Sequence, residues 1–135
     1  MTDKELVKTA EEMRGLAYIP YSGYSVGAAL LAKDGRVFTG CNIENAAYSA
    51  TNCAERTAFF KAVSEGVTEF SKIAVAAGPK GKPSAGGAPC GVCRQVMLEF
   101  CDKDFEILIA EGSDFTSLTL DEIIPYGFSP KDLEN

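Results

Sequence analysis

Apolar residues recur along the chain with two periods, and these periods predict an alternation of helices and strands. Residues 3–18 carry apolar side chains three or four positions apart between charged ones, as in an amphipathic helix, with Asp3 as its N-cap. An apolar stretch over 25–33 and a second one over 36–43 flank an Asp-Gly turn. This pattern is typical of a β-hairpin.

The rest of the chain alternates helical and extended patterns. The predicted elements are a helix over 53–65, a strand over 73–77, a helix over 91–102, strands over 105–110 and 115–119, and a helical turn over 119–124. Strands separated by helices favour parallel pairing, with the helices packed on the sheet. We therefore predict an α/β fold: a three-layer α/β/α sandwich around a mixed sheet of about five strands, with helices on both faces. Residues 1–135 are expected to form a single domain.

Composition narrows the classes of function. An apolar fraction of 46% indicates a globular protein, and a net charge of −6 argues against a nucleic acid polymer as partner. No apolar run approaches the ~20 residues of a membrane span, and the first residues do not resemble an export signal. Five cysteines in such a chain are typical of free thiols in a reducing compartment, so we expect no membrane partner and a cytoplasmic location.

Three cysteines and one glutamate are the candidates for chemistry. Cys53 and the Cys90-x-x-Cys93 pair each lie at the predicted start of a helix, where the helix dipole favours a thiolate. The chain has no histidine, so a zinc site here would use three thiolates and leave its fourth position to water. Glu55 follows the first sulfur by two residues and could transfer protons. This combination predicts metal-assisted hydrolysis.

The same residues allow other interpretations. An isolated Cys-x-x-Cys is also found in redox pairs, in structural zinc sites and among core thiols. A structural site would need a fourth ligand, and the remaining sulfurs, Cys41 and Cys101, lie in patterns more typical of core residues. Zinc with three thiolates carries a net charge of −1, so a neighbouring cation would stabilise the site by offsetting this charge. Arg56 and Arg94 follow the two motifs and could compensate this charge or face solvent.

Three motifs lie at Cys-Asn-Ile-Glu-Asn-Ala-Ala-Tyr (41–48), Cys-Ala-Glu-Arg-Thr-Ala (53–58) and Pro-Cys-Gly-Val-Cys-Arg-Gln (89–95). With them the chain resembles the cytidine deaminase family, in its short homotetrameric form, over nearly its whole length. The zinc pattern alone marks the wider deaminase group. The Asn-Ile-Glu-Asn stretch narrows the resemblance to enzymes of free nucleosides.

The resemblance implies a mechanism. Cys53, Cys90 and Cys93 would hold one zinc ion per chain, and a hydroxide formed there would attack C4 of cytidine or deoxycytidine. Glu55 would shuttle the protons until ammonia leaves, and Arg56 would compensate charge at the thiolates. The products would be uridine and deoxyuridine, a step of pyrimidine salvage.

The resemblance also implies a set of substrate contacts. Two of them, Asn42 and Glu44, would bind ribose hydroxyls. The carboxylate of Glu44 would also repel the phosphate of a nucleotide. Others would be supplied across subunits, so we expect a homotetramer with shared active sites. The implied contact residues are Asn42, Glu44, Tyr24, Ala54, Ala46, Tyr48 and Phe128.

Two alternatives remain at this point. A deaminase of another small heterocycle, such as blasticidin S, would share the cysteine motifs, although the pair Asn42 and Glu44 with Arg56 favours cytidine. A non-catalytic structural zinc module would need a fourth protein ligand and would not depend on Glu55. The stretch 80–87 is longer than the family pattern and is predicted to be a surface excursion.

Overall fold

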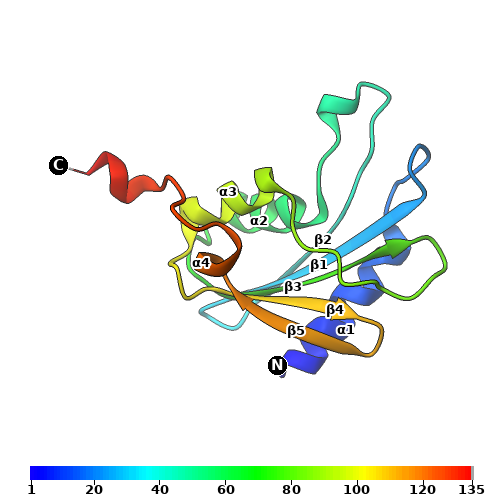
Figure 1. Cartoon of the computed structure of the whole chain (residues 1–135), viewed down its shortest axis with the longest axis horizontal. Coiled ribbons are helices and arrows are strands. Elements are labelled where there is room, and N and C mark those ends of the chain that lie inside the picture. Colours follow the sequence, from blue (N-terminus) through cyan, green and yellow to red (C-terminus); the bar gives the residue numbers. More distant parts are fainter. Residues whose placement is uncertain (135) are drawn as a thin grey trace.

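The computed structural model describes residues 1–134, and its centre is a five-stranded mixed sheet (Figure 1). The strands are β1 (Tyr24–Ala32), β2 (Val37–Cys41), β3 (Phe70–Pro79), β4 (Glu106–Glu111) and β5 (Asp114–Thr119). Their order across the sheet is β2-β1-β3-β4-β5. β1 runs antiparallel to β2 and β3, β3 runs parallel to β4, and β4 and β5 form an antiparallel hairpin. The connection between the parallel strands β3 and β4 contains a helix, as the alternating pattern predicts.

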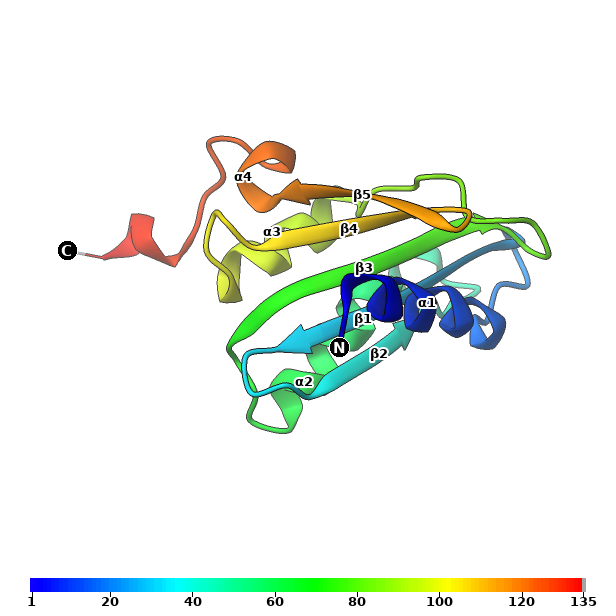
Figure 2. The same cartoon turned by 90° about the horizontal axis from the view of Figure 1, so that it is seen from below.

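Helices cover both faces of this sheet. Helix α1 (Asp3–Met13) lies on one face, and α2 (Ala54–Ser64) and α3 (Gly91–Phe100) lie on the other, as Figure 2 shows. A short helix, α4 (Leu120–Ile123), follows β5. Short 3-10 turns complete the set at Arg14–Leu16, Tyr48–Ala50 and Pro130–Leu133. The predicted sandwich of helices and mixed sheet is confirmed.

Two hydrophobic cores explain why the central strands are apolar on both sides. Ile73 and Val75 of β3 face the core under α2 and α3, which is centred on Phe59. The intervening Ala74 faces the second core, beside Leu6 of α1. Strands buried on both faces read as continuous apolar runs rather than as an alternation. This is the pattern by which the sequence identifies β3 as a central strand.

Small residues bring the helices close to the sheet. A Cβ atom at Gly27 of β1 would lie 2.8 Å from the backbone nitrogen of Arg14, and one at Gly40 of β2 would lie 2.7 Å from the backbone nitrogen of Ala58 in α2. Both distances are shorter than any van der Waals contact. Glycine at these two positions therefore sets the distance of α1 and α2 from the sheet.

Several predicted boundaries were wrong. The helix predicted over 3–18 ends at Met13 and continues only as a 3-10 turn. Its N-cap is Thr2, whose side chain accepts a hydrogen bond from the backbone N–H of Glu5, whereas Asp3 pairs with Lys72 at 2.8 Å. The strand predicted over 73–77 spans Phe70–Pro79, because β1 pairs with it along its whole length.

The helix predicted over 91–102 ends at Phe100. The stretch 80–87, predicted to be a surface excursion, is exposed only in part. Residues 80–83, 85 and 86 are exposed, but Ser84 is buried and the backbone N–H of Gly86 donates to the carbonyl of Ala110. The stretch is thus hydrogen-bonded to the end of β4. Within residues 1–134, no helix combines the length and the apolar character required to cross a membrane.

Candidate active site

Three cysteine sulfurs converge where α2 and α3 begin. Cys53 is the N-cap of α2, Cys90 is the N-cap of α3, and Cys93 lies in the first turn of α3. Their sulfur atoms all lie within 4.8 Å of one another, and those of Cys53 and Cys90 are 3.7 Å apart. Tetrahedral zinc with Zn–S bonds of about 2.3 Å requires sulfurs about 3.8 Å apart. The donor set therefore fits a zinc ion.

The cluster has three members among the residues that the structure describes. A structural zinc site is usually closed by four protein ligands, whereas a catalytic site has three and one open position. Cys41 and Cys101 stand apart from the cluster. Cys101 packs against the core under α2 and α3, and burial raises the pKa of its thiol to about 12. The arrangement corresponds to the open, catalytic type of site.

Local charges prepare one sulfur for a metal. The Cys93 thiol and then the Arg56 guanidinium donate hydrogen bonds to Cys53, and they lower its pKa to about 5. The same hydrogen bond, together with burial, raises the pKa of Cys93. The positive ends of the two helix dipoles also favour thiolates at these positions. These contacts favour the thiolate form of Cys53, the form in which cysteine binds a metal.

Glu55 lies in the first turn of α2, beside the cluster. Its side chain is buried, with 4% of the residue exposed. Burial, and next the negative charge of Cys53, raise the pKa of this carboxyl to about 7. A carboxyl that titrates near neutral pH can both accept and return a proton, which suits general acid–base catalysis.

A pocket of about 210 Å³ opens beside the sulfurs. Its walls come from β1, the end of β3, the stretch after β2, the start of α2 and the segment before α3. The structure brings six of the predicted site residues to this pocket, namely Tyr24, Asn42, Cys53, Ala54, Glu55 and Cys90. Val26, Val75 and Ala77 supply an apolar wall. The pocket thus places an apolar surface, a buried carboxyl and a candidate metal cluster around one small volume.

The amide of Asn42 is tied to the first strand. Its Oδ1 accepts a hydrogen bond from the backbone N–H of Val26 at 3.0 Å, and its Nδ2 donates to the carbonyl of Tyr24 at 2.9 Å. These bonds fix the amide at the wall of the pocket. The sequence singled out Asn42 but gave no indication of its partners, which lie 16 and 18 residues away.

Glu44 holds a loop and does not line the pocket of its own chain. Its Oε1 accepts from the backbone N–H groups of Tyr21 and Ser22 at 3.0 and 3.1 Å, and its Oε2 accepts from the Ser22 hydroxyl. The hydrogen bonds from Ser22 lower the pKa of Glu44 below its ordinary value. The carboxylate therefore fixes the turn that precedes Tyr24.

Three predicted contacts lie outside the pocket of their own chain. Ala46, Tyr48 and Phe128 are exposed. The Tyr48 ring packs edge-on against Tyr21 with 5.9 Å between centroids, and the Phe128 carbonyl accepts from Gln95 at 2.7 Å. The structure does not bring these three residues to Glu55, so their roles stay predictions.

The two arginines beside the motifs differ. Nη2 of Arg56 lies 3.1 Å from the sulfur of Cys53, the arrangement expected of charge compensation. Arg94 donates instead to the backbone carbonyls of Pro89 and Ile123, at 2.7 and 2.6 Å. It ties α4 to the start of α3, and its hydrogen bonds do not reach the sulfurs.

Comparison with known proteins places this fold and site in the class of zinc-dependent deaminases. The family model described as "Cytidine and deoxycytidylate deaminase zinc-binding region" matches residues 1–109. The chain belongs to this family. The predicted resemblance, the enzyme class and the zinc cofactor are thereby confirmed.

Relatives and solved structures extend the similarity to the whole chain. A cytidine deaminase of Sporosarcina psychrophila is 48% identical over 98% of this chain and 96% of its own, and one of Halalkalibacterium halodurans is 47% identical over 100% of both chains. The crystal structure of a cytidine deaminase from Burkholderia pseudomallei superimposes with a TM-score of 0.86 at 42% identity, covering 95% of this chain and 100% of that one. A blasticidin-S deaminase of Bacillus cereus is 30% identical over 94% of this chain.

Proposed function

We propose that this protein catalyses the hydrolytic deamination of cytidine and deoxycytidine, giving uridine or deoxyuridine and ammonia. The observation that carries the proposal is the buried Glu55 carboxyl at the wall of a small pocket, beside three cysteine sulfurs spaced for zinc. The higher identity to relatives named cytidine deaminase, 47–48% against 30% for the blasticidin-S deaminase, favours cytidine as the substrate.

The reaction divides between the metal and one carboxyl. Zinc held by Cys53, Cys90 and Cys93 would lower the pKa of a water molecule and so supply the nucleophile. Glu55 accepts one proton as water adds to C4 and passes it to the ring nitrogen N3. It then takes the remaining proton from the new C4 hydroxyl and delivers it to the amino group, so that the C4–N bond breaks, ammonia leaves and the C4 carbonyl forms. Burial disfavours the charged form of the Glu55 carboxyl and raises its pKa, which suits a group that must both accept and return a proton.

The rest of the pocket orients the nucleoside. The apolar side chains of Val26, Val75 and Ala77 can contact the faces of a pyrimidine and exclude water from the reacting carbon. Tyr24 and Ala54 line the same volume. Arg56 compensates the negative charge of the thiolates through its hydrogen bond to Cys53. These groups hold C4 of the base toward the sulfur cluster.

Asn42 and Glu44 are the proposed ribose contacts. Asn42 already lies at the pocket, whereas Glu44 would act at its rim while holding the turn before Tyr24. A carboxylate at the sugar end of the pocket repels a phosphate group. We therefore propose a free nucleoside as the substrate, rather than a nucleotide or a nucleic acid polymer.

We further propose a homotetramer in which subunits share their active sites. The support is that Tyr48 and Phe128 are aromatic, exposed and outside the pocket of their own chain, with 74% and 60% exposure. Large exposed aromatic side chains are typical of protein interfaces. Ala46 lies in the same loop as Tyr48. The roles in pyrimidine salvage and in the cytoplasm stay predictions that accompany this proposal.

A substrate panel tests the proposed function. Purified protein is assayed with cytidine, deoxycytidine, cytidine monophosphate and blasticidin S, and kcat/KM is measured for each. We expect the two nucleosides to exceed the other two compounds by at least ~100-fold, because an unpaired or repelled polar group in a tight site is costly. Comparable turnover of cytidine monophosphate contradicts the role of Glu44, and preference for blasticidin S contradicts the proposed substrate.

A further inference from the structure

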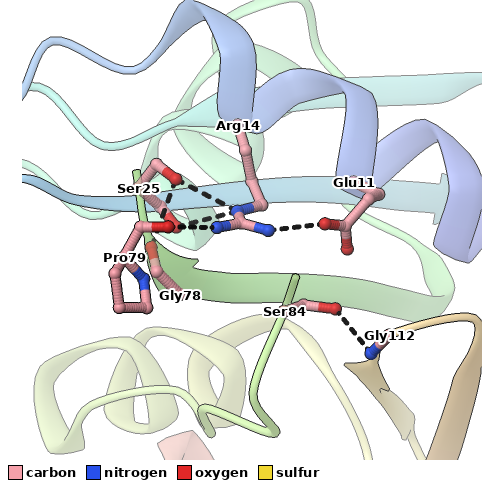
Figure 3. Close-up of polar contacts among 7 residues, drawn as sticks. All are labelled: Glu11, Arg14, Ser25, Gly78, Pro79, Ser84 and Gly112. Atoms are coloured by element: carbon pink, nitrogen blue, oxygen red, sulfur yellow. Dashed lines mark hydrogen bonds and ion pairs between the residues drawn. The ribbon is translucent and has the colours of Figure 1, made fainter. Parts of the chain in front are cut away.

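Arg14 is a buried cation that joins three elements close to the pocket (Figure 3). It follows directly after α1, and only 9% of the residue is exposed. Its Nε donates to the carbonyl and the hydroxyl of Ser25, at 3.2 and 3.0 Å. Its Nη2 donates to the carbonyl of Pro79 at 3.0 Å, and its Nη1 pairs with Glu11 at 2.5 Å. The guanidinium thus bridges α1, β1 and β3.

The bridged residues lie where the β1–β3 ladder ends. Ser25 pairs with Gly78 and Tyr24 pairs with Pro79. The Ser25 hydroxyl also donates to the carbonyl of Gly78 at 3.2 Å. This side-chain hydrogen bond joins β1 and β3 in addition to their backbone pairing at this point. We refer to Arg14, Ser25, Gly78 and Pro79 as the Arg14 clamp.

Gly78 shows how closely the clamp is packed. A Cβ atom at Gly78 would lie 2.8 Å from the carbonyl oxygen of Pro83 and 3.0 Å from Nη2 of Arg14. Both contacts are tighter than packed atoms normally make. The guanidinium and the segment after β3 therefore share one narrow space, and the guanidinium has little room to take another position.

Both sides of the clamp lead directly to the pocket. Tyr24 and Val26, the neighbours of Ser25, line the pocket on the β1 side. On the other side, segment 80–88 runs from Pro79 toward Cys90, and its last two residues also line the pocket.

These two walls touch each other. A Cβ atom at Gly87 would lie 2.8 Å from the hydroxyl oxygen of Tyr24, so the phenol packs directly on the glycine backbone. The position of Gly87, and with it the path of the chain to Cys90, depends on how β1 and the end of β3 are held together.

Segment 80–88 has a second attachment at its middle. Ser84 is buried, and both its carbonyl and its hydroxyl oxygen accept from the backbone N–H of Gly112, each at 3.0 Å (Figure 3). The four residues between this attachment and the clamp, 80–83, are all exposed. Backbone hydrogen bonds of Lys80 to Gly23, of Ala85 to Ala77 and of Gly86 to Ala110 also hold this stretch, so the clamp is one of several attachments of the segment before Cys90.

Stability alone does not account for a charge at this place. Burying a cation costs free energy that an ion pair only partly returns, and an apolar side chain of similar size is often as stable. A guanidinium offers what an apolar residue or a lysine cannot, because its rigid, planar fork donates in several fixed directions at once. In this protein the N–H groups of Arg14 point at acceptors on two different strands, Ser25 of β1 and Pro79 of β3.

We propose that Arg14 is a positioning residue of the active site, acting through Ser25 and Pro79 to hold Tyr24 and segment 80–88 in register. It sets the distance between two walls of the pocket and the approach of the chain to the ligand Cys90. This proposal rests on the proposed function, because it assigns Arg14 to the active site. The expected changes in the mobility of segment 80–88 and in zinc retention do not depend on which nucleoside is turned over.

The test compares R14K, R14Q and S25A with the wild type. R36Q is the matched control, because Arg36 also forms an ion pair, with Asp34 at 2.8 Å, but on the exposed β1–β2 hairpin. Three quantities are measured: amide hydrogen exchange of residues 79–89, the rate of zinc release to a chelator, and kcat and KM for cytidine. S25A removes the hydroxyl that accepts from Arg14 and donates to Gly78, while leaving the guanidinium and its hydrogen bond to the Ser25 carbonyl, so it remains informative if R14Q does not fold.

We expect R14K and R14Q to raise amide exchange in residues 79–89 and to speed zinc release by about 10-fold, in keeping with the effect of losing a support around a metal site. We expect kcat/KM to fall on the order of 10- to 100-fold, as for small displacements of reacting groups. S25A should show the same changes in smaller measure, and R36Q none.

Rescue by R14K to wild-type exchange and zinc release would overturn the proposal, because it would show that only a positive charge is needed. Uniformly raised exchange over the whole chain would overturn it as well, because it would reduce Arg14 to a general stabiliser. Failure of the wild type to act on cytidine would contradict the proposed function instead, and would leave the exchange and zinc measurements valid.

Discussion

Nη2 of Arg56 donates a hydrogen bond to the sulfur of Cys53 over 3.1 Å, across one turn of the helix that carries both residues. The chain has no histidine, and if the three clustered cysteines bind the metal as thiolates, as we propose, their combined charge exceeds that of zinc. The arginine offsets part of this excess without competing for the metal, since a guanidinium has no lone pair to offer. A cation in this position would reduce the negative charge of a three-thiolate site.

Replacing Arg56 with glutamine should weaken the site. Glutamine keeps a polar side chain but removes the positive charge beside Cys53. We expect activity or zinc affinity to fall on the order of 10- to 100-fold, the usual effect of losing a partner of a metal ligand. Competition with a colorimetric chelator measures zinc affinity, with R36Q as the exposed arginine control. Equal zinc affinity and equal activity in R56Q and R36Q would refute a role for this contact.

Removing zinc should destabilise the fold. The three sulfurs join the starts of α2 and α3, so metal binding stabilises the native state alone. At free zinc ~1,000 times its dissociation constant, binding contributes about 4 kcal/mol, which corresponds to a loss of roughly 10 to 15 °C in Tm on removal. Calorimetry before and after dialysis against a chelator, with zinc measured in both samples, provides the test. An unchanged Tm in verified zinc-free protein would show that the cluster does not bind metal in the native state.

Replacing Glu44 with glutamine should have an effect on stability that depends on pH. Hydrogen bonds from Ser22 and from the backbone lower the pKa of Glu44 below 4.5, its ordinary value. A lowered folded-state pKa means that the carboxylate contributes stability above about pH 4.5, and that this contribution is lost as pH falls through the folded-state value. We expect wild type and E44Q to differ in urea unfolding at pH 6, and this difference to shrink progressively as the pH falls below 4.5 and through the lowered folded-state pKa. A difference that does not change with pH would indicate another cause.

Replacing Gly40 with alanine should disturb the start of α2. The added Cβ atom would lie 2.7 Å from the backbone nitrogen of Ala58, and backbone cannot move aside as a side chain can. We expect a loss of about 1 to 3 kcal/mol in unfolding free energy, the usual cost of overpacking, together with lower activity because α2 carries Glu55. Gly15 is the control, since no atom lies within 4 Å of a Cβ atom there. Equal stability of G40A and G15A would contradict the close approach of α2.

The sequence alone predicts the metal cluster and most of the elements, because both depend on local patterns. Cys53 and Cys90 were expected at the starts of two helices, and the structure places them as the N-caps. Glu55 was expected beside them because it follows Cys53 by two residues, in the first turn of the same predicted helix. Residues linked by short-range spacing are positioned by the helix itself, so spacing carries the information.

Contacts between distant segments could not be predicted in this way. Arg14 reads as one more charged residue at the end of an amphipathic helix, yet its partner Pro79 lies 65 residues further along. The contact of Tyr24 with Gly87 likewise depends on the β1–β3 register. No local pattern encodes these pairings, because they arise only when the strands are placed side by side. Glu44 was selected by resemblance, and its hydrogen bonds to Tyr21 and Ser22 emerged from the fold.

The most direct test of the account is ammonia release from cytidine by the wild type and by E55Q, with zinc content determined on the same samples. We expect about one zinc per chain in both proteins, turnover by the wild type, and a loss of about 10²- to 10⁴-fold or more in E55Q, because the proton carrier is removed while the sulfurs are untouched. Turnover by E55Q at the wild-type rate, with zinc bound, would contradict the role of Glu55 and with it the proposed mechanism.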